Sequence, residues 1–377
     1  MVTDTPLPYS SLRREIAERL CSFFATSGDG RASSPDSGAA IASSQGPHRD
    51  RNEDRGAIVR FRFGAVRPDL RLGILCDGMG GMAGGGDAAG LAISSFIAAF
   101  ATIEISCPLN ERLERACLFA NREVFGTFNG AAGTTLTAIG FSNHAMYAVH
   151  VGDSRLYGID EHRGIKLFTQ DDTVSGAVNA HLGQAAEDEM DNRLLQFVGI
   201  GEDINPHLVE MADRSLQFWL LTSDGAHGVG RRALSGICEG SRSPIDLVRK
   251  LIYVAEALNT QDNATALCIR SGYVKSQEEE HEGLTLQVTT ADKGLEIWLP
   301  RSAMQIAETK SFDSINDVKE TSRRSEPVLA ERADRQPARN RRTPGTSRKR
   351  KPKQSSKSAD TIQSPMDLVF QVGNNDD

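Results

Sequence analysis

Short apolar runs with an acidic residue at one end recur along the chain. The clearest, residues 72–76, is followed by Asp77 and then by glycines. Runs of this length beside glycine are typical of buried strands, so the pattern predicts strands whose ends carry carboxylates. The runs that share it are 56–59 after Asp54, 72–76 before Asp77, 146–151 before Asp153, 218–222 before Asp224 and 264–269 after Asp262.

Other segments repeat apolar residues at three- and four-residue spacing, which predicts helices. In 244–258, for example, Leu247, Leu251 and Val254 lie on one stripe. The helices expected are 9–25, 87–103, 111–128 and 244–258. The further strands expected are an edge strand at 39–45, one opening at 133 and reaching 141, a hairpin at 156–159 and 165–168, two strands within 208–224 around 213–215, and a hairpin at 284–288 and 295–299.

These elements predict an α/β (α+β) sandwich, in which two antiparallel β-sheets pack face to face and helices flank both sides. Strand ends can gather at one edge of such a fold, and the acidic residues with them. Buried carboxylates without basic partners are costly unless they hold a cation. Carboxylate oxygens suit hard divalent cations such as Mg²⁺ and Mn²⁺, so we expect a metal site at one sheet edge.

Composition narrows the class of protein further. The chain has 377 residues, 39% of them hydrophobic, and a net charge of −7 at pH 7, as in an ordinary globular protein. No run approaches the roughly 18 apolar residues of a membrane span, and the start lacks the basic and apolar regions of a signal peptide. The six cysteines have no metal-ligand spacing and are expected to be free thiols. We expect a cytoplasmic, monomeric protein without a transmembrane segment.

Changes in composition divide the chain into four parts. Residues 1–37 are expected to form a helix and, from 26 to 37, a flexible linker. Residues 38–273 form the main domain, 274–301 a small β-hairpin extension, and 302–377 a disordered tail. Within the tail, 332–357 contains eleven Lys or Arg and one Asp, so it carries +10 while the rest of the chain carries −17. This basic tail can contact an acidic partner, nucleic acid or anionic lipid, or fold back weakly on the acidic body.

Several short motifs give the chain a family resemblance. Each alone is weak, because Asp-Gly and Asp-Asn are common in turns. The motifs, in chain order, are R-x-R-N-E-D at 49–54, D-G-M-G-G at 77–81, G-T-T-L at 133–136, V-G-D-S-R at 151–155, T-S-D-G at 222–225 and D-N-A-T at 262–265. In this order, over about residues 38 to 272, they resemble the metal-dependent (type 2C) protein serine/threonine phosphatases in their bacterial form.

The resemblance implies hydrolysis of phosphoserine and phosphothreonine on a phosphorylated protein substrate, opposing a bacterial Ser/Thr kinase. A phosphate monoester dianion repels nucleophiles, and water attacks it extremely slowly. Two Mn²⁺ or Mg²⁺ ions would neutralise this charge and activate a water. The resemblance also implies that bacterial members bind a third ion.

The resemblance implies roles for individual acids. Asp77 bridges the two ions, and the Gly78 carbonyl is a second ligand on one of them. Asp224 and Asp262 hold one ion of the pair. The set of metal residues implied is Glu53, Asp77, Gly78, Asp153, Asp224 and Asp262.

Two of the remaining acids are expected to act less directly. Glu53 lies near the second ion, mostly through water, and Asp54 orients waters. Asp153, together with Asp224, matches the position of the third ion. On the residues alone, Asp54 or Asp262 could instead cap a turn, and Asp153 could pair with Arg155.

A guanidinium is expected beside the site, because its planar donors match phosphate oxygens. The family's phosphate-binding arginine stands four residues before the motif glutamate, at Arg49, with Arg51 as a near alternative. The catalytic residues implied are Asp77, Asp54 and Arg49. Arg49 could otherwise be a surface charge.

Departures from the family pattern concern the proton donor and the flap. Met79 stands where many eukaryotic relatives have histidine, so acid catalysis would fall to water or be weaker. Asp171-Asp172 stands where the family usually has Asp-His, in a polar region, 171–203, that carries a mobile flap in relatives.

Other classes of protein remain as alternatives. A pseudophosphatase that binds phosphoproteins or regulates a kinase would be favoured by loss of a core carboxylate, and none is lost. A calcium-binding module would need a D-x-D-x-D-G loop. A serine hydrolase could use Ser223 and His227 but lacks a G-x-S-x-G elbow. A nucleic-acid binder would rest on the basic tail alone.

Overall fold

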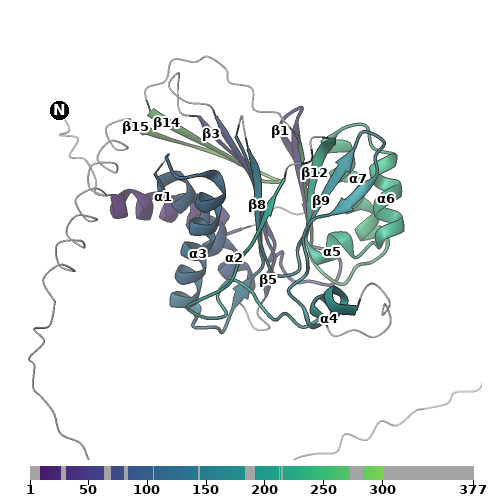
Figure 1. Ribbon diagram of the computed structural model, residues 1–377, viewed down its shortest axis with the longest axis horizontal. Helices are drawn as coiled ribbons and strands as arrows, with labels where there is room; N and C mark the ends of the chain where they lie inside the picture. The colour runs from purple at the N-terminus through teal and green to yellow at the C-terminus, as the bar shows by residue number, and fades with distance from the viewer. Residues whose placement is uncertain are drawn as a thin grey trace, which may run out of the picture. The chain divides into compact units, whose positions relative to one another are not determined.

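Antiparallel pairing assembles the strands into two large sheets (Figure 1). Sheet A has the order β1-β2-β13-β12-β9-β10, and sheet B has the order β11-β8-β7-β4-β3-β14-β15. Sheet A consists of β1 (Arg31–Asp36), β2 (Ala39–Ser44), β9 (Arg155–Asp160), β10 (Ile165–Leu167), β12 (Leu216–Thr222) and β13 (Ala264–Arg270). Sheet B consists of β3 (Arg55–Arg62), β4 (Leu70–Cys76), β7 (Leu136–Phe141), β8 (Met146–Val151), β11 (His207–Glu210), β14 (Gly283–Thr289) and β15 (Gly294–Pro300). A short pair, β5 (Gly78–Met79) and β6 (Gly133–Thr134), lies beside them.

This computed structural model describes one unit of the chain, within Met1–Arg324. The described residues are 9–26, 31–62, 69–79, 84–104, 106–142, 145–182, 192–211, 213, 215–271 and 283–300. The predicted tail 302–377, with its basic segment 332–357, lies outside them, as do Gly80 and Gly81.

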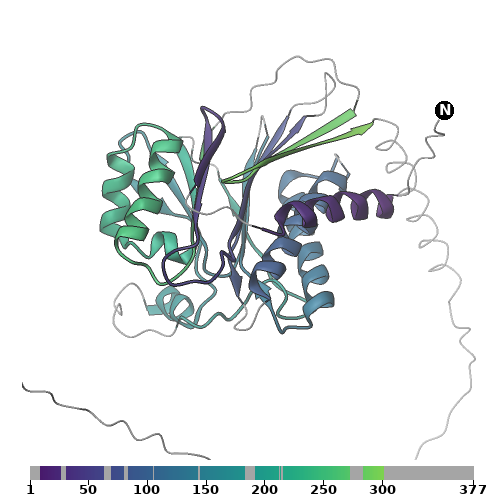
Figure 2. The same ribbon diagram turned by 180° about the vertical axis from the view of Figure 1, so that it is seen from behind.

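Helices cover the outer face of each sheet, as Figures 1 and 2 show. Outside sheet B lie α1 (Tyr9–Phe24), α2 (Gly85–Thr102) and α3 (Leu109–Phe128). Outside sheet A lie α5 (Asp224–His227), α6 (Arg231–Glu239) and α7 (Pro244–Ala257). The α4 helix (Val174–Leu182) lies near one end of the sandwich. The predicted sandwich, with two antiparallel sheets and helices on both sides, is confirmed.

Three apolar layers hold the sandwich together. One lies between sheet B and its helices, one between sheet A and its helices, and one between the two sheets. In the middle layer Trp219 is fully buried and meets Phe168 edge to face, with ring centroids 5.1 Å apart. Alternation along each strand supplies the inward residues of both sheets.

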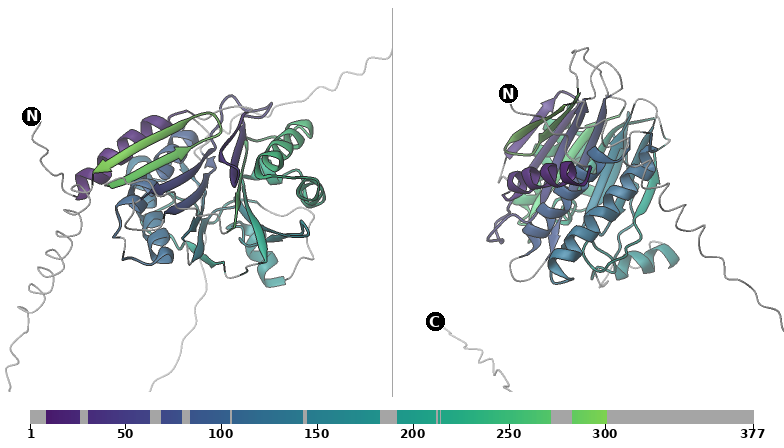
Figure 3. Two further views of the ribbon diagram at one scale, coloured as in Figure 1. Left: turned by 90° about the horizontal axis from the view of Figure 1, so that it is seen from above. Right: turned by 90° about the vertical axis from the view of Figure 1, so that its left-hand side faces the viewer.

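The α2 helix is long and apolar enough to cross a membrane, judged by length and composition alone. However, 83% of that window is buried inside the domain. It packs between α1, α3 and sheet B, as the right-hand view in Figure 3 shows. An apolar helix in this position is a core helix, which explains its composition.

Local sequence explains where several elements begin and end. In α7, Ser243 is the N-cap and its hydroxyl accepts a hydrogen bond from the Asp246 amide at 3.3 Å, while Pro244 occupies the first turn. The α3 helix ends at Asn129, which adopts the left-handed conformation with φ 50°. These features fall close to the ends predicted from the apolar spacing.

The linker predicted for 26–37 is wrong at residues 31–36. These residues form β1, which pairs with β2, so the predicted edge strand at 39–45 is an inner strand. The sequence of β1 is small and polar, so it lacks the alternation that would reveal a strand. Pro35 is tolerated there because β1 has a free side.

The hairpin predicted near 284–299 is confirmed, but it is part of the main sheet. Strand β14 pairs with β3 along residues 285–289, and β14 and β15 contribute buried residues to the layer under α1 and α2. The two strands predicted within 208–224 also form, although β11 joins sheet B and β12 joins sheet A. Helix α6 was not predicted.

Candidate active site

Asp77 follows the last residue of β4 and is held through its main chain. Its amide donates to the Thr135 hydroxyl at 3.0 Å, and its carbonyl accepts from the Thr135 amide at 2.9 Å. The Thr134 hydroxyl donates to the same carbonyl at 2.9 Å. The G-T-T-L motif therefore anchors Asp77 and leaves its carboxylate free of these interactions. Figure 1 places β5 and α5, which begin beside Asp77 and at Asp224, toward the same end of the sandwich.

Three carboxylate oxygens at this edge are buried and accept no hydrogen bond within the described residues. They are both oxygens of Asp54 and one oxygen of Asp224. The hydroxyls of Ser223 and Thr265 lie near Asp54 and act to lower its pKa, but neither makes a well-aligned hydrogen bond with it. Buried acceptors without donors are the arrangement that a cation satisfies.

Burial and mutual repulsion raise the pKa of the clustered carboxyls. Desolvation is the main cause for Asp77, whose pKa lies well above its ordinary value, and Asp54 and Asp224 add repulsion. Burial also raises the pKa of Asp54 to about 7. The pKa of Asp153 rises to about 7 through burial and through Asp224. Burial raises the pKa of Asp224, and Asp262 adds to the effect. The structure thus brings these five acids together, as the sequence predicted.

Glu53 and Gly78 converge at the start of α2. A Cβ on Gly85 would lie 2.7 Å from Glu53 Oε2 and 2.9 Å from the Gly78 carbonyl oxygen. Two predicted oxygen ligands therefore lie around one point, and only glycine fits there. The Glu53 amide donates to Asn263 Oδ1 at 2.8 Å, which fixes the main chain of this residue.

Asp262 and Arg49 form an ion pair at the rim of the cluster. Both side chains are partly exposed, Arg49 to 47%. The guanidinium predicted to bind phosphate therefore lies beside a predicted metal ligand. Arg49 is therefore a partly exposed charge that is paired with Asp262.

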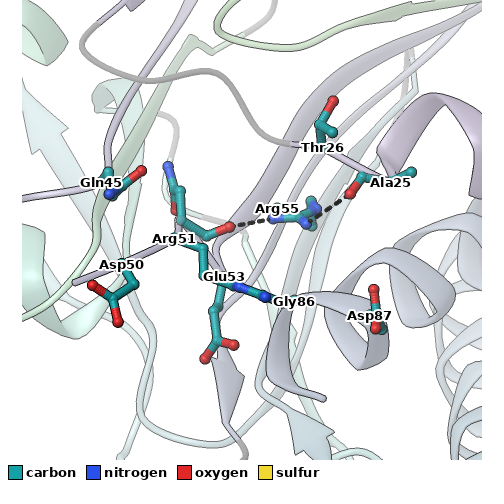
Figure 4. Close-up of a pocket in the computed structure, with 10 residues that line it drawn as sticks. Ala25, Thr26, Gln45, Asp50, Arg51, Glu53, Arg55, Gly86 and Asp87 are labelled. Atoms are coloured by element: carbon teal, nitrogen blue, oxygen red, sulfur yellow. Dashed lines mark hydrogen bonds between the residues drawn. The ribbon is translucent and has the colours of Figure 1, made fainter. Parts of the chain in front are cut away.

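Arg51 lies farther out, on a polar pocket of about 300 Å³ (Figure 4). Its side chain is exposed, and its carbonyl accepts from Asn263 Nδ2 at 3.0 Å. Glu53 borders both this pocket and the carboxylate cluster. The other lining residues are Ala25, Thr26, Gln45, Asp50, Asn52, Arg55, Gly86 and Asp87.

Asp153 does not pair with Arg155, so that alternative is wrong. Arg155 instead makes a bidentate pair with Asp171, with its Nε and Nη2 3.0 and 2.7 Å from the two carboxylate oxygens. Asp172, at the departure from the family pattern, accepts from the Gly152 amide at 2.9 Å and lies 2.7 Å from His207 Nε2. These two acids therefore hold the loop that carries Asp153.

The serine hydrolase alternative lacks a Ser–His pair. Ser223 Oγ accepts from the Thr265 amide at 2.9 Å, whereas His227 Nδ1 lies 3.1 Å from the Thr222 hydroxyl. Burial lowers the pKa of His227 to about 3, which is unsuited to a general base at neutral pH. Ser223 supports the strand end beside Asp224, as expected.

Several residues of the site were not given a role from the sequence. Asn263 is buried and donates to the Gln45 and Arg51 carbonyls at 2.7 and 3.0 Å. Asn52 accepts from the Asp54 amide at 3.0 Å, and Arg55 binds carbonyls around it. Both asparagines directly precede or follow a predicted acidic ligand, and this adjacency within R-x-R-N-E-D and D-N-A-T was the available signal.

The donor set fits divalent cations, although it is open. Among the residues that the structure describes, no group of three or more His, Cys, Asp or Glu side chains is placed to hold a metal ion. The fit rests instead on the unsatisfied oxygens of Asp54 and Asp224 and on the carbonyl of Gly78 beside Glu53. Hard divalent cations accept such mixed oxygen sets and keep water ligands.

Known proteins resemble part of this chain. No family model matches the chain. The serine/threonine protein phosphatase PstP of Mycobacterium tuberculosis is 30% identical over 183 residues, which are 46% of this chain and 35% of that protein. The chain thus spans about a third of the length of this curated relative.

Several solved structures are matched over nearly their whole length. The PPM Ser-Thr phosphatase MsPP from Mycobacterium smegmatis, in complex with cacodylate, has a TM-score of 0.52 and 28% identity, with 61% of this chain and 97% of that chain covered. The PstP catalytic domain in complex with two manganese ions has a TM-score of 0.50 and 26% identity, covering 62% and 97%. Stp1 from Staphylococcus aureus, at 22% identity and a TM-score of 0.55 over 62% and 94%, shares the fold.

The sandwich and its edge of buried acids define the class as the PPM α/β sandwich fold. The six motifs stand in the family's order along the sequence, and five of them supply the clustered acids. Together with the matches, they make the described domain similar to bacterial PPM serine/threonine phosphatases.

Proposed function

We propose that this protein is a metal-dependent phosphatase that hydrolyses phosphoserine and phosphothreonine on proteins. The observation that carries the proposal is the set of buried, unsatisfied oxygens of Asp54 and Asp224 within a cluster of acids. Such a cluster is electrostatically unfavourable on its own, and divalent cations would relieve it. The Mn²⁺ complex of the PstP catalytic domain supports Mn²⁺ or Mg²⁺ as the cations.

The residues of the site have distinct tasks in this proposal. Asp77, Asp224, Asp262 and the Gly78 carbonyl would hold two cations, with Glu53 beside the second. The cations, when bound, supply positive charge for the phosphate and lower the pKa of water. Asp153 would contribute to a third cation with Asp224.

Asp54 and Arg49 would serve the substrate side of the reaction. Asp54, buried and free of donors, can accept hydrogen bonds from water and orient it. Arg49 lies at the exposed rim, where its guanidinium can leave Asp262 and bind a phosphate oxygen. Arg51, on the adjacent pocket, would contact the chain that carries the phosphate.

The setting of the enzyme is part of the proposal. We infer a cytoplasmic, monomeric phosphatase that reverses a Ser/Thr kinase. We also infer that the basic segment 332–357, with a charge of +10, contacts an acidic partner. The motifs and the acidic body support this setting.

The test is hydrolysis of a phosphothreonine peptide by the full chain, with Mn²⁺, with Mg²⁺ and with a chelator. We expect turnover that depends on the cation and that Asp77→Asn abolishes. Arg242→Gln, a change on the exposed surface near α7, serves as the matched control and should retain full turnover.

The alternative function is that of a catalytically weak pseudophosphatase, and the same experiment tests it. A folded protein that binds phosphopeptide but shows no turnover with any divalent cation would support that reading and would contradict the proposal. All the core carboxylates are present and gathered, which favours the enzyme.

A further inference from the structure

A buried arginine joins the N-terminal helix to the acidic site. Arg55 is the first residue of β3 and is only 5% exposed. Its Nε donates to the Phe24 carbonyl at 2.7 Å, and its Nη2 reaches the Ala25 carbonyl at 3.4 Å. These carbonyls belong to the end of α1, where a helix has unsatisfied acceptors and partial negative charge. Arg55 therefore caps α1.

The same guanidinium holds the main chain on both sides of Glu53. Its Nη1 donates to the Asn52 carbonyl at 2.8 Å and to the Asp54 carbonyl at 2.9 Å. Figure 4 shows Arg55 between this loop and Ala25. Because a guanidinium is planar and rigid, its four acceptors cannot move independently of one another.

The start of α2 leaves this arrangement little room to move. A Cβ on Gly86 would lie 3.1 Å from Arg55 Nη2 and 3.5 Å from Glu53 Cα. A Cβ on Gly90 would lie 3.2 Å from the Phe24 carbonyl oxygen. The end of α1, the guanidinium and the Glu53 loop are therefore packed against one face of α2.

The α1 helix itself is firmly docked. Leu12, Ile16, Leu20 and Phe24 are buried in the layer shared with α2. This helix lies before the part of the chain, 38 to 272, that carries the family motifs. The α1 helix thus lies outside the motif-bearing segment. Through Arg55 it contacts the loop that carries Glu53 and Asp54.

We propose that Arg55 is a positioning residue that couples the docked α1 helix to the cation affinity of the site. It fixes the main chain of residues 52–54 against the end of α1, and so sets where the Glu53 and Asp54 side chains stand. The inference rests on the proposed function, because it concerns residues expected to hold or surround divalent cations.

The first test is a calorimetric titration of the full chain with Mn²⁺, comparing wild type with Arg55→Met. Loss of a residue that orients metal ligands typically weakens affinity by about 10- to 100-fold, and we expect a rise of that order in Kd. Arg55→Lys keeps the charge but cannot bind both segments, so its Kd should lie between the two. Amide hydrogen exchange of residues 53 and 54 should be faster in both variants.

Arg112→Met is the matched control. Arg112 is also a buried arginine, donates to the Ile103 carbonyl at the end of α2, and lies over the Phe100 ring at 5.0 Å. It caps a helix in the same layer without contacting the acidic edge. We expect Arg112→Met to lower thermal stability while leaving the Mn²⁺ Kd unchanged.

Gly90→Ala tests the coupling without altering Arg55. The new methyl group would push on the Phe24 carbonyl, so we expect a smaller rise in the Mn²⁺ Kd and faster exchange at residues 53 and 54. This variant also decides the question if Arg55→Met fails to fold.

An unchanged Mn²⁺ Kd in folded Arg55→Met, or in Gly90→Ala when Arg55→Met does not fold, would overturn the inference. A wild-type protein that binds no Mn²⁺ would instead contradict the proposed function. In that case exchange at residues 53 and 54 in the metal-free variants still decides whether Arg55 holds this loop, and unchanged exchange overturns the inference.

Discussion

The acids of the site are anchored through their main chains, while their carboxylates are left with few donors. Thr135 binds the main chain of Asp77, and Asn263 binds that of Glu53. An acid held in this way keeps its oxygens available for a cation, at the cost of instability when no cation is present.

That instability predicts an unusual pH dependence of the free energy of unfolding of the metal-free protein. The folded-state pKa of Asp54 and of Asp153 is raised from 3.8 to about 7. Between these values the folded protein binds more protons than the unfolded chain, so the free energy of unfolding falls as pH rises. We expect the melting temperature measured in chelator to fall from pH 5 to pH 7.5.

Asp54→Asn tests whether Asp54 causes this fall in melting temperature with rising pH. The amide does not titrate, so the decrease between pH 5 and pH 7.5 should become shallower. Asp213→Asn is the control, because Asp213 is exposed and the Ser215 hydroxyl lowers its pKa, so it is ionised in both the folded and the unfolded protein between pH 5 and pH 7.5 and contributes no slope there. An identical slope in wild type and Asp54→Asn would show that Asp54 does not carry a raised pKa.

Asn263→Ala is predicted to loosen the loop before β3. The side chain makes three hydrogen bonds, to Glu53, Gln45 and Arg51, and each buried partner left unsatisfied costs about 1–3 kcal/mol. We expect a loss of unfolding free energy of roughly 2–5 kcal/mol by denaturant titration. Exposed Asn259→Ala is a comparison that also removes an asparagine, although its φ of 56° favours asparagine by a small amount. A loss for Asn263→Ala no larger than for Asn259→Ala would contradict this role.

At the scale of elements, the β14–β15 hairpin is a structural part of sheet B. Leu286 is fully buried on β14, in the layer beneath α1 and α2. Leu286→Ala should therefore cost about 2–5 kcal/mol of unfolding free energy, as for other buried leucines. Leu258→Ala, at a leucine that is 56% exposed, should cost well under that. Equal losses in the two variants would show that the hairpin is peripheral.

The sequence predicted the elements whose signal is local. The apolar run before Asp77 predicted β4, and the stripe through Leu247 and Leu251 predicted α7. Strand β1 was missed because its small polar residues have no period, and its position is determined by pairing with β2. Pairing between distant segments, such as β14 with β3, has no local signal at all.

In the candidate site, too, the residues with a local signal could be predicted and their long-range contacts could not. Each acid stands near a strand end, and the family resemblance implied a role for it. The partners that hold these acids, such as Asn263 just before β13 and Arg55 at the start of β3, come from segments that meet only in the folded protein. Their contacts depend on side-chain geometry, which the order of motifs does not specify.

At the scale of the whole molecule, the predicted ligands come from both sheets. Asp77 follows β4 of sheet B, whereas Asp224 follows β12 and Asp262 precedes β13 of sheet A. Cations bound by all three would connect the two sheets at one edge. They would also remove the repulsion that raises the carboxyl pKa values in their absence.

Cation binding should therefore stabilise the entire sandwich, because the unfolded chain cannot gather these residues. A ligand at about 100 times its Kd adds about 2.7 kcal/mol. For a domain of this size that corresponds to a rise in melting temperature of roughly 5–10 °C. We expect calorimetric melting to shift by this amount between chelator and saturating Mn²⁺, and the shift to grow with cation concentration.

Asp77→Asn separates this effect from general binding of cations to an acidic surface. The variant keeps the fold and nearly all of the surface charge but loses the expected bridging ligand, so its melting temperature should respond little to Mn²⁺. In chelator it should melt at or above the wild-type temperature, because one buried carboxylate has been removed from the cluster. If Asp77→Asn gained as much stability from Mn²⁺ as wild type, the cations would be acting elsewhere, and the connection between the sheets at this edge would be refuted.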